Sequence, residues 1–265
     1  MSDKRVAVVT GARRGIGKAT ALAMAAAGFR VAVTSSNPGL PVAGAKGTAA
    51  GLSSTVDAIT AAGGEALALP MDLLDRASIG RVVDAVIAQW GQIDVLVNNA
   101  IYQGDTLQCT VMDSAPDMLE RVFLGQVVNT TCLTQRVIAA ALDRHPVTVI
   151  NVGSAGGRFD DAQPHPAGQA GTSFVYAASK AALHKLAPAL HTELAHAGVT
   201  AFTLNPGVVQ TEALAEFVGS VAGASPVEMP ARVIAWLATA PEAATLSGTY
   251  QDAVALHARY CCTGG

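Results

Sequence analysis

The sequence contains Thr10-Gly11-Ala12-Arg13-Arg14-Gly15-Ile16-Gly17 between a short apolar run, residues 5–10, and a helical run, residues 18–27. A strand, a glycine-rich loop and a helix in this order point backbone N–H groups and the positive end of the helix dipole towards a pyrophosphate. The glycines also let a ligand approach the backbone closely. Glycines serve ordinary tight turns as well, but this context favours a dinucleotide-binding site.

The alternation of strand and helix continues along the chain. It predicts an α/β fold, a doubly wound parallel sheet with helices on both faces. No linker-like segment divides residues 1–265, so we expect a single domain. The expected strands are 5–10, 29–35, 66–71, 93–97, 147–152, 199–204 and one near Thr249, and the expected helices are 18–27, 53–62, 75–90, 117–142, one beginning near Tyr176, and 227–240. Two long loops, 37–51 and 153–173, and a mobile segment, 211–225, complete the chain.

Composition limits the kinds of partner. Apolar residues make up 51% and charged residues 14%, which suits a buried sheet with subunit contacts, so we expect a homo-oligomer, a dimer or a tetramer. A net charge of -3 with scattered basic residues argues against nucleic acid. No apolar run approaches the roughly 18 residues of a membrane-spanning helix, so we expect a cytoplasmic protein without a membrane partner.

Cysteine and histidine spacing gives no sign of a metal site. The cysteines, at 109, 132, 261 and 262, show neither a disulfide framework nor a metal-ligand spacing, and we interpret them as reduced thiols. His184, His191 and His196 share a helical run but do not form an i, i+4 pair. We therefore expect no bound metal.

A second motif, Tyr176-Ala177-Ala178-Ser179-Lys180, begins an Ala-rich helical run. On a helix this spacing puts Tyr176 and Lys180 on one face. An ammonium group beside a phenol favours the phenolate and lowers the pKa of the phenol from about 10. Tyr176 is therefore a candidate general acid and base. An exposed Tyr and Lys one turn apart on an ordinary helix are the alternative.

The two motifs together resemble the short-chain dehydrogenase/reductase family, which combines TGxxxGxG with YxxxK in this order. The resemblance covers essentially the whole chain. Further matches are Asp72 after the third strand, Asn98-Asn99-Ala100 after the fourth, and Asn205-Pro206-Gly207 with Thr211 after the sixth. Taken singly, these residues would be a helix N-cap, a turn and a strand terminator. In one chain and in this order they favour the family.

The resemblance implies an oxidoreductase that interconverts a ketone and a secondary alcohol by hydride transfer. Ser154 and Tyr176 would hydrogen-bond the substrate carbonyl, Tyr176 would transfer the proton, and Lys180 would hold the nicotinamide ribose and lower the pKa of Tyr176. Aligning the long helix with that of the family puts Gln126 where a catalytic Asn usually supports a water-mediated proton path to the lysine, with Asn129 one turn later.

Other departures concern the loops. Ile101 replaces the last glycine of NNAG, and the spacing from Ser154 to Tyr176 and the loop 37–51 are both longer than expected. Asp160 and Asp161 lie in the longer of these loops, where solvated charges are the ordinary interpretation.

The choice of cofactor depends on the end of the second strand, where relatives that prefer NAD carry an acid that binds the ribose hydroxyls. Ser35, Ser36 and Asn37 stand here instead, and Arg14 resembles the basic residue of members that prefer NADP. We expect NADP(H), with NAD(H) as the alternative. The resemblance implies as cofactor-binding residues Gly11, Arg13, Arg14, Gly15, Ile16, Gly17, Ser35, Ser36, Asp72, Leu73, Asn99, Ala100, Tyr176, Lys180, Pro206, Gly207, Val209 and Thr211.

Two other functions stay open at this point. Gln126 and Ile101 are compatible with an NADP-binding regulatory or structural subunit of little turnover. A lyase without redox chemistry is less compatible, because the glycine loop is intact. The substrate, a small carbonyl compound or alcohol, is not identified by the sequence. Apolar residues at 214, 217, 218 and 221 predict only that segment 211–225 forms an apolar substrate lid.

Overall fold

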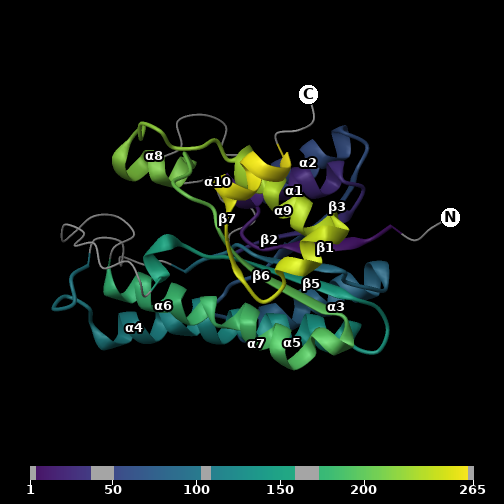
Figure 1. Ribbon diagram of the computed structural model, residues 1–265, viewed down its shortest axis with the longest axis horizontal. Helices are drawn as coiled ribbons and strands as arrows, with labels where there is room; N and C mark the ends of the chain where they lie inside the picture. Colours follow the sequence, from purple (N-terminus) through teal and green to yellow (C-terminus); the bar gives the residue numbers. More distant parts are fainter. Residues whose placement is uncertain (1–3, 37–50, 103–108, 159–172, 262–265) are drawn as a thin grey trace.

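The computed structural model describes residues 4–36, 51–102, 109–158 and 173–261. Seven parallel strands form one sheet in the order β3-β2-β1-β4-β5-β6-β7 (Figure 1). The strands are β1 Val6–Val9, β2 Arg30–Ser35, β3 Glu65–Pro70, β4 Val95–Asn98, β5 Val147–Val152, β6 Val199–Asn205 and β7 Tyr250–Asp252. The predicted doubly wound parallel sheet is confirmed.

Helices cover both faces of the sheet in two layers (Figure 1). The upper layer in that view contains α1 Gly15–Ala26, α2 Leu52–Ala61, α8 Glu212–Val218, α9 Glu228–Thr239 and α10 Ala253–Leu256, and the lower layer contains α3 Arg76–Trp90, α4 Pro116–Phe123, α5 Thr130–Ala141, α6 Phe174–His184 and α7 Leu186–Leu194. Within β1 the side chains alternate between two apolar cores: Ala7 and Val9 face one, Val6 and Val8 the other. All four are buried, which explains why the strand is a continuous apolar run rather than an alternating one.

The order in which strands join the sheet reverses between β1 and β4. These two strands are neighbours in the sheet, although two strands separate them in sequence. In register, Val9 pairs with Val33 of β2 on one side and with Val97 of β4 on the other. Open parallel sheets form their ligand crevice at the carboxyl ends of strands where the strand order reverses. This edge lies at the left of Figure 1, beside α6 and α8.

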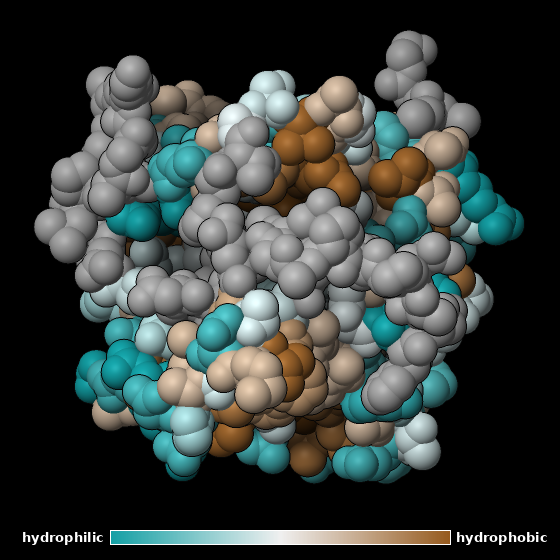
Figure 2. Space-filling model, turned by 90° about the vertical axis from the view of Figure 1, so that its left-hand side faces the viewer, coloured by the Kyte–Doolittle hydropathy of each residue, from teal (hydrophilic) through white to brown (hydrophobic). Residues whose placement is uncertain are grey.

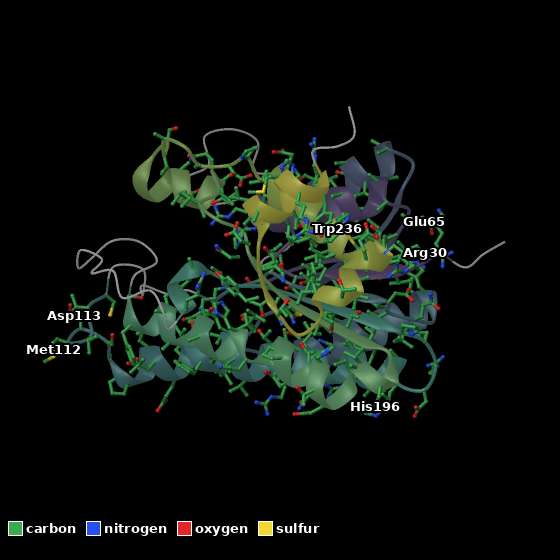
Figure 3. All side chains as sticks on the ribbon, in the orientation of Figure 1. Arg30, Glu65, Met112, Asp113, His196 and Trp236 are labelled. Atoms are coloured by element: carbon green, nitrogen blue, oxygen red, sulfur yellow. The ribbon has the colours of Figure 1, made fainter. Side chains whose placement is uncertain are left out.

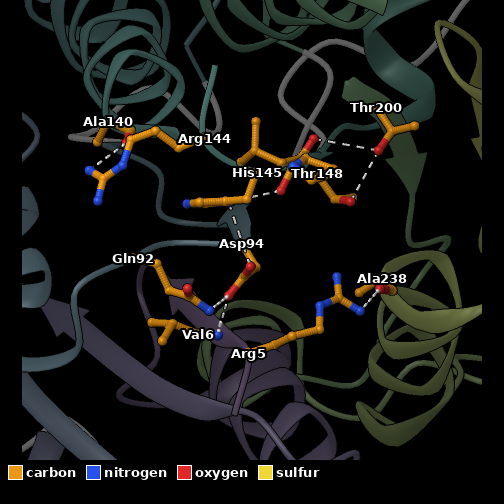
Figure 4. Close-up of polar contacts among 12 residues, drawn as sticks. Arg5, Val6, Gln92, Asp94, Ala140, Arg144, His145, Thr148, Thr200 and Ala238 are labelled. Carbon is orange, nitrogen blue, oxygen red and sulfur yellow. Dashed lines mark hydrogen bonds and ion pairs between the residues drawn. The ribbon is translucent and has the colours of Figure 1, made fainter. Parts of the chain in front are cut away.

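A buried carboxylate ties the two central strands together where they begin. Asp94 accepts the Val6 N–H at 2.6 Å and the Gln92 side-chain amide at 3.0 Å, and His145 Nδ1 lies 3.7 Å from its other oxygen (Figure 4). Arg5 donates to the Ala238 carbonyl at 3.0 Å, which fastens the same end of the sheet to α9. These contacts stabilise the edge opposite the crevice.

The helix expected over 117–142 differs from the prediction, because its middle is π-helical. The regular helices α4 and α5 flank a π-helix, η2, at Leu124–Asn129. The Thr130 hydroxyl donates to the Gly125 carbonyl at 3.0 Å. A side chain at Gly125 would lie 3.0 Å from Tyr102 Cβ, so glycine permits the close approach of this turn to the β4 loop. Short π-helices often occur at functional sites.

Segment 211–225, expected as a mobile stretch, contains the helix α8. Its first turn is capped by Thr211, whose hydroxyl accepts the Leu214 N–H at 3.1 Å. Gln210 closes the following loop, because its side chain accepts the Val221 N–H at 2.9 Å and donates to the Gly219 carbonyl at 3.1 Å. This helix was not predicted, because it spans only seven residues.

The start of the first helix, the two long loops and the cysteines were also subjects of prediction. The first helix begins at Gly15, earlier than residue 18. Loop residues 37–50 and 159–172, with Asp160 and Asp161, lie outside the described residues, as does Cys262. In the part of the chain that is described, Cys109 and Cys132 are free thiols, no group of metal-binding side chains is present, and no helix is long and apolar enough to cross a membrane.

Candidate active site

The glycine loop folds tightly over the end of β1. Gly11 has φ +67° and Gly15 has φ +56°, both in the left-handed region that favours glycine. A Cβ on Gly17 would lie 2.3 Å from the Gly11 carbonyl oxygen, so helix and loop meet too closely for any side chain. The helix α1 begins at Gly15 without a side-chain cap, which leaves N–H groups of its first turn available to an anion.

The loop after β4 holds the glycine loop in place. The Asn99 side-chain amide donates to the Thr10 carbonyl at 2.8 Å, and the Ala100 N–H donates to the Thr10 hydroxyl at 2.9 Å. Asn98 instead points into the sheet, where its amide donates to Asn151 at 2.9 Å and Thr134 at 3.0 Å. Asn99 therefore supports the backbone of the glycine loop, whereas Asn98 joins β4 to β5 and α5 through side chains.

A cavity of about 930 Å³ lies at this edge of the sheet. It is lined by every residue predicted to bind the cofactor and by Ser154, Tyr176 and Lys180. Figure 2 shows this side of the molecule, where apolar surface lies in both the upper and the lower part. The site residues predicted from scattered motifs are thus close together in space, with the exception of Gln126.

Ser154 and Tyr176 form the polar centre of the cavity wall. The Ser154 side chain lies near enough to the Tyr176 hydroxyl to lower its pKa, and Ser154 also accepts the Gly156 N–H at 3.3 Å. Tyr176 lies in the first turn of α6, which Ser173 caps by accepting the Tyr176 N–H at 3.3 Å. Ser154 lies two residues beyond Val152, the last residue of β5. A strand end and a helix start therefore bring the two hydroxyls together.

Lys180 lies one helical turn beyond Tyr176 and is only 2% exposed. Its ammonium donates to the Val152 carbonyl at 2.9 Å and lies 5.8 Å from the centre of the Tyr176 ring. Burial lowers the pKa of Lys180 from 10.5 to about 8. The shared helical face predicted from the sequence is confirmed by this contact.

The predicted effect on Tyr176 has the opposite sign in the structure. Burial raises the pKa of Tyr176 above 10.0, and the neighbouring Ser154 side chain opposes this only in part. The Lys180 ammonium is directed at the Val152 carbonyl. The phenol is accordingly held in its protonated form, and the expectation of a lowered pKa was wrong for this state of the protein.

Gln126 does not line the cavity with the other three residues. It is 2% exposed, and its amide donates to the Tyr102 carbonyl at 2.9 Å, while Oε1 is buried and has no partner among the described residues. Asn129 has a different contact set: it donates to the Leu73 carbonyl at 2.6 Å and accepts from Arg76. Asn129 therefore supports the loop after β3.

At the opposite end of the cavity lie the residues expected to choose between the two dinucleotides. Ser35 is 9% exposed, and Asp72 accepts the Leu74 N–H at 2.8 Å through one of its oxygens. Arg14 is paired with Glu216 of α8, with Nη1 3.1 Å from Oε1. The sequence did not predict this ion pair, since the helix that carries Glu216 was not expected.

Sequence reasoning also missed several residues of the cavity wall. These are Met71, Tyr102, Val152, Ala155, Gly156, Arg158, Ala177, Val208 and Ala213. It also missed His184, considered only as a metal ligand, whose Nε2 accepts the Ser154 N–H at 3.3 Å. The i, i+4 spacing from Lys180 was the available signal for His184, because it puts both side chains on one helical face.

Comparison with known proteins agrees with this fold and site. Residues 5–221 match the family model for short chain dehydrogenase. The chain is 31% identical over 253 residues to a 3-oxoacyl-[acyl-carrier-protein] reductase of Synechocystis sp., covering 92% of this chain and 93% of that one. It is 32% identical over 217 residues to a sorbitol dehydrogenase of Cereibacter sphaeroides, covering 79% and 72%.

A solved structure has the same fold. It is a 3-ketoacyl-(acyl-carrier-protein) reductase from Brucella melitensis complexed with NADH, with a TM-score of 0.74, 22% identity, and coverage of 95% of this chain and 97% of that one. The chain belongs to the short-chain dehydrogenase/reductase family, a family of oxidoreductases.

Proposed function

We propose that the protein is an NADP(H)-dependent oxidoreductase that interconverts a ketone and a secondary alcohol. The observation that carries the proposal is the pair of neighbouring hydroxyls, Ser154 and Tyr176, which line the same cavity as the glycine loop. A carbonyl oxygen between two donors is polarised, which is the arrangement that carbonyl reduction needs. A relative named as a reductase and another named as a dehydrogenase fit one reaction run in either direction.

The residues present suit a dinucleotide. The uncapped start of α1 offers N–H groups to a pyrophosphate, and Gly17 lets this start pack closely against the glycine loop. Asp72 and Leu73 would border the adenine, and Pro206, Gly207, Val209 and Thr211 would border the nicotinamide. A nicotinamide dinucleotide supplies or removes a hydride when it is bound.

Each catalytic residue then has a chemical role of its own. Ser154 positions the substrate oxygen, and Tyr176 gives its proton to that oxygen in reduction and takes it back in oxidation. Lys180 would bind the cofactor ribose and replenish the proton of Tyr176. Gln126 has a buried Oε1 that has no partner among the described residues and would accept a hydrogen bond from a water on the path to Lys180.

NADP(H) is the proposed cofactor for two reasons. The cavity wall has serines, Ser35 and Ser36, where a carboxylate would repel the 2′-phosphate, and it includes Arg14, whose guanidinium group would bind that phosphate. We further propose that 211–225 is the substrate lid of a single domain, because Ala213 and Leu214 of α8 line the cavity. The alternative, an NADP-binding subunit of little turnover, is favoured by one contact: Gln126 donates to the Tyr102 carbonyl at 2.9 Å.

A screen of ketones and alcohols, monitored by NADPH absorbance, distinguishes an oxidoreductase from a cofactor-binding subunit. Only the oxidoreductase should change the absorbance when substrate is added. Tyr176→Phe then tests the role of the hydroxyl, because it removes only that group. Turnover should fall by about two to four orders of magnitude, while the Kd for NADPH and the melting temperature stay close to those of the unmodified protein. Tyr260→Phe is the control, because Tyr260 stacks on Trp236 at 4.4 Å and does not line the cavity.

The pH dependence of the reaction gives a second check on Tyr176. Because the proton donor is the phenol, reduction should lose rate as pH rises through a pKa above 10.0, and oxidation should gain rate there. Normal reduction of the best ketone by Tyr176→Phe would rule out this role and leave the cofactor-binding fold.

A further inference from the structure

His184, the last residue of α6, lies beneath the catalytic serine. It follows Lys180 by one helical turn and Tyr176 by two, so all three share a helical face. Its Nε2 accepts the Ser154 N–H at 3.3 Å. Cβ atoms built on Gly153 and Gly157 would lie 2.7 Å from Nε2 and Cε1 of this ring. The loop after β5 therefore closes around the imidazole, and glycine at both positions makes room for it.

The hydrogen bond from the Ser154 N–H to His184 lies where the chain leaves the hydrogen-bonding pattern of the sheet. One residue earlier, the Gly153 N–H donates across the sheet to the Leu204 carbonyl at 2.8 Å. Ser154 has left β5, and the short turn Ala155–Gly157 follows it. The imidazole accepts the first main-chain N–H beyond the sheet, on the residue that carries the catalytic hydroxyl.

The surroundings keep the ring able to accept. Burial, together with the Lys180 and Arg158 cations, lowers the pKa of His184 from 6.5 to about 4, and a hydrogen bond with the Gly157 backbone is the one opposing contribution. The Tyr250 ring of β7 covers another side, with ring centres 5.0 Å apart at 61°. These neighbours, with Tyr176 on the same helix, include no carboxylate that would favour a protonated ring.

We propose that His184 is a positioning residue for the reaction: it accepts the Ser154 N–H and thereby keeps the Ser154 hydroxyl in hydrogen-bonding reach of Tyr176. The inference rests on the proposed function, because it assumes that this pair of hydroxyls binds the substrate carbonyl. It assigns His184 no contact with substrate or cofactor.

Two substitutions separate the hydrogen bond from the volume of the ring. His184→Leu fills the space without an acceptor, whereas His184→Gln offers an amide oxygen at a similar reach. For the leucine variant, kcat should fall roughly ten- to hundredfold with little change in the Kd for NADPH, because the serine is displaced. The glutamine variant should recover most of that loss. His196→Leu is the control, because His196 is exposed and lies away from the cavity (Figure 3).

The activities of the leucine and glutamine variants decide between a hydrogen-bonding role and a space-filling role for His184. If the leucine variant were as active as the glutamine variant, the ring would only fill space and the proposal would be overturned. If either variant failed to fold, nitrogen NMR of the unmodified protein would decide. Near pH 6 the His184 signal should be that of a neutral ring with an unprotonated Nε2, and a protonated Nε2 would overturn the proposal. The NMR result does not depend on turnover, so it stands even if no carbonyl compound is reduced and the proposed function fails.

Discussion

Arg14 Nη1 lies 3.1 Å from Glu216 Oε1, so an ion pair joins the glycine loop to α8 across the two walls of the cavity. Both side chains are about one-third exposed, at 31% and 29%. Arg14 is also the residue that we expect to bind the 2′-phosphate of NADP(H). A phosphate and the Glu216 carboxylate would therefore compete for one guanidinium group.

Glu216→Gln removes this competition and should tighten NADPH binding. A partly exposed ion pair contributes about 0.2–1 kcal/mol, so the Kd for NADPH should fall by a factor of about 1.4 to 5, whereas the Kd for NADH should not change. Calorimetry with both dinucleotides measures this difference. Glu242→Gln is a matched control, since Glu242 is exposed and outside the cavity wall. An equal effect on NADH would show that Arg14 does not distinguish the two cofactors.

Ser35→Asp tests the other part of cofactor choice. Ser35 ends β2, is 9% exposed and lines the cavity. A carboxylate there would repel a 2′-phosphate and accept hydrogen bonds from ribose hydroxyls, so the ratio of the Kd values should shift towards NADH by about tenfold or more. Tighter binding of NADH than of NADPH by the unmodified protein would sink the proposed preference.

Gln126→Asn shortens the side chain that stands at the position of the family asparagine. The Nε2 bond to the Tyr102 carbonyl should be lost, but the amide stays on the π-helix near α6. We expect turnover to be kept or raised, with little change in the Kd for NADPH. Steady-state kinetics and cofactor titration are the measurements. Loss of cofactor binding would mean that Gln126 supports the cavity and not the proton path.

Lys180→Met should separate stability from activity. The folded state lowers the pKa of Lys180 from 10.5 to about 8, so between these values the unfolded chain binds more protons. The free energy of unfolding should therefore rise with pH across this window, and the methionine variant should lose that rise.

At pH 7 the same variant should be about 1–2 kcal/mol more stable, since it no longer buries a charge, even after loss of the bond to the Val152 carbonyl. Its turnover and its affinity for NADPH should both fall. Urea unfolding at several pH values measures the stability, and a less stable variant at pH 7 would contradict the expected cost of burying this charge.

The sheet could be predicted because its five central strands are short runs that are buried on both faces, whereas the two edge strands, β3 and β7, are more exposed. The helix α8 could not, because seven residues between loops carry too little periodicity and its stability depends on Thr211 and Gln210. The π-helix was also beyond prediction, since residues 116–141 keep one helical pattern in the sequence.

Motifs located most of the cavity wall, because ordered loops after parallel strands meet at one edge of the sheet. They did not give the sign of the pKa change at Tyr176. The Lys180 charge could be inferred from the spacing, but the depth of burial, which decides the direction, is a property of the folded chain. His184 was missed for a related reason: its partner is a main-chain N–H, which no side-chain pattern reveals.

The π-helix at Leu124–Asn129 also affects how this chain can be recombined with relatives. Each of its backbone bonds encloses one residue more than an α-helical bond does. A relative with a regular helix here would have to be aligned with a one-residue gap for α4 and α5 both to match. A chimera that ignored the gap would turn every side chain on one of these helices by about 100°, so crossover points belong outside residues 116–141.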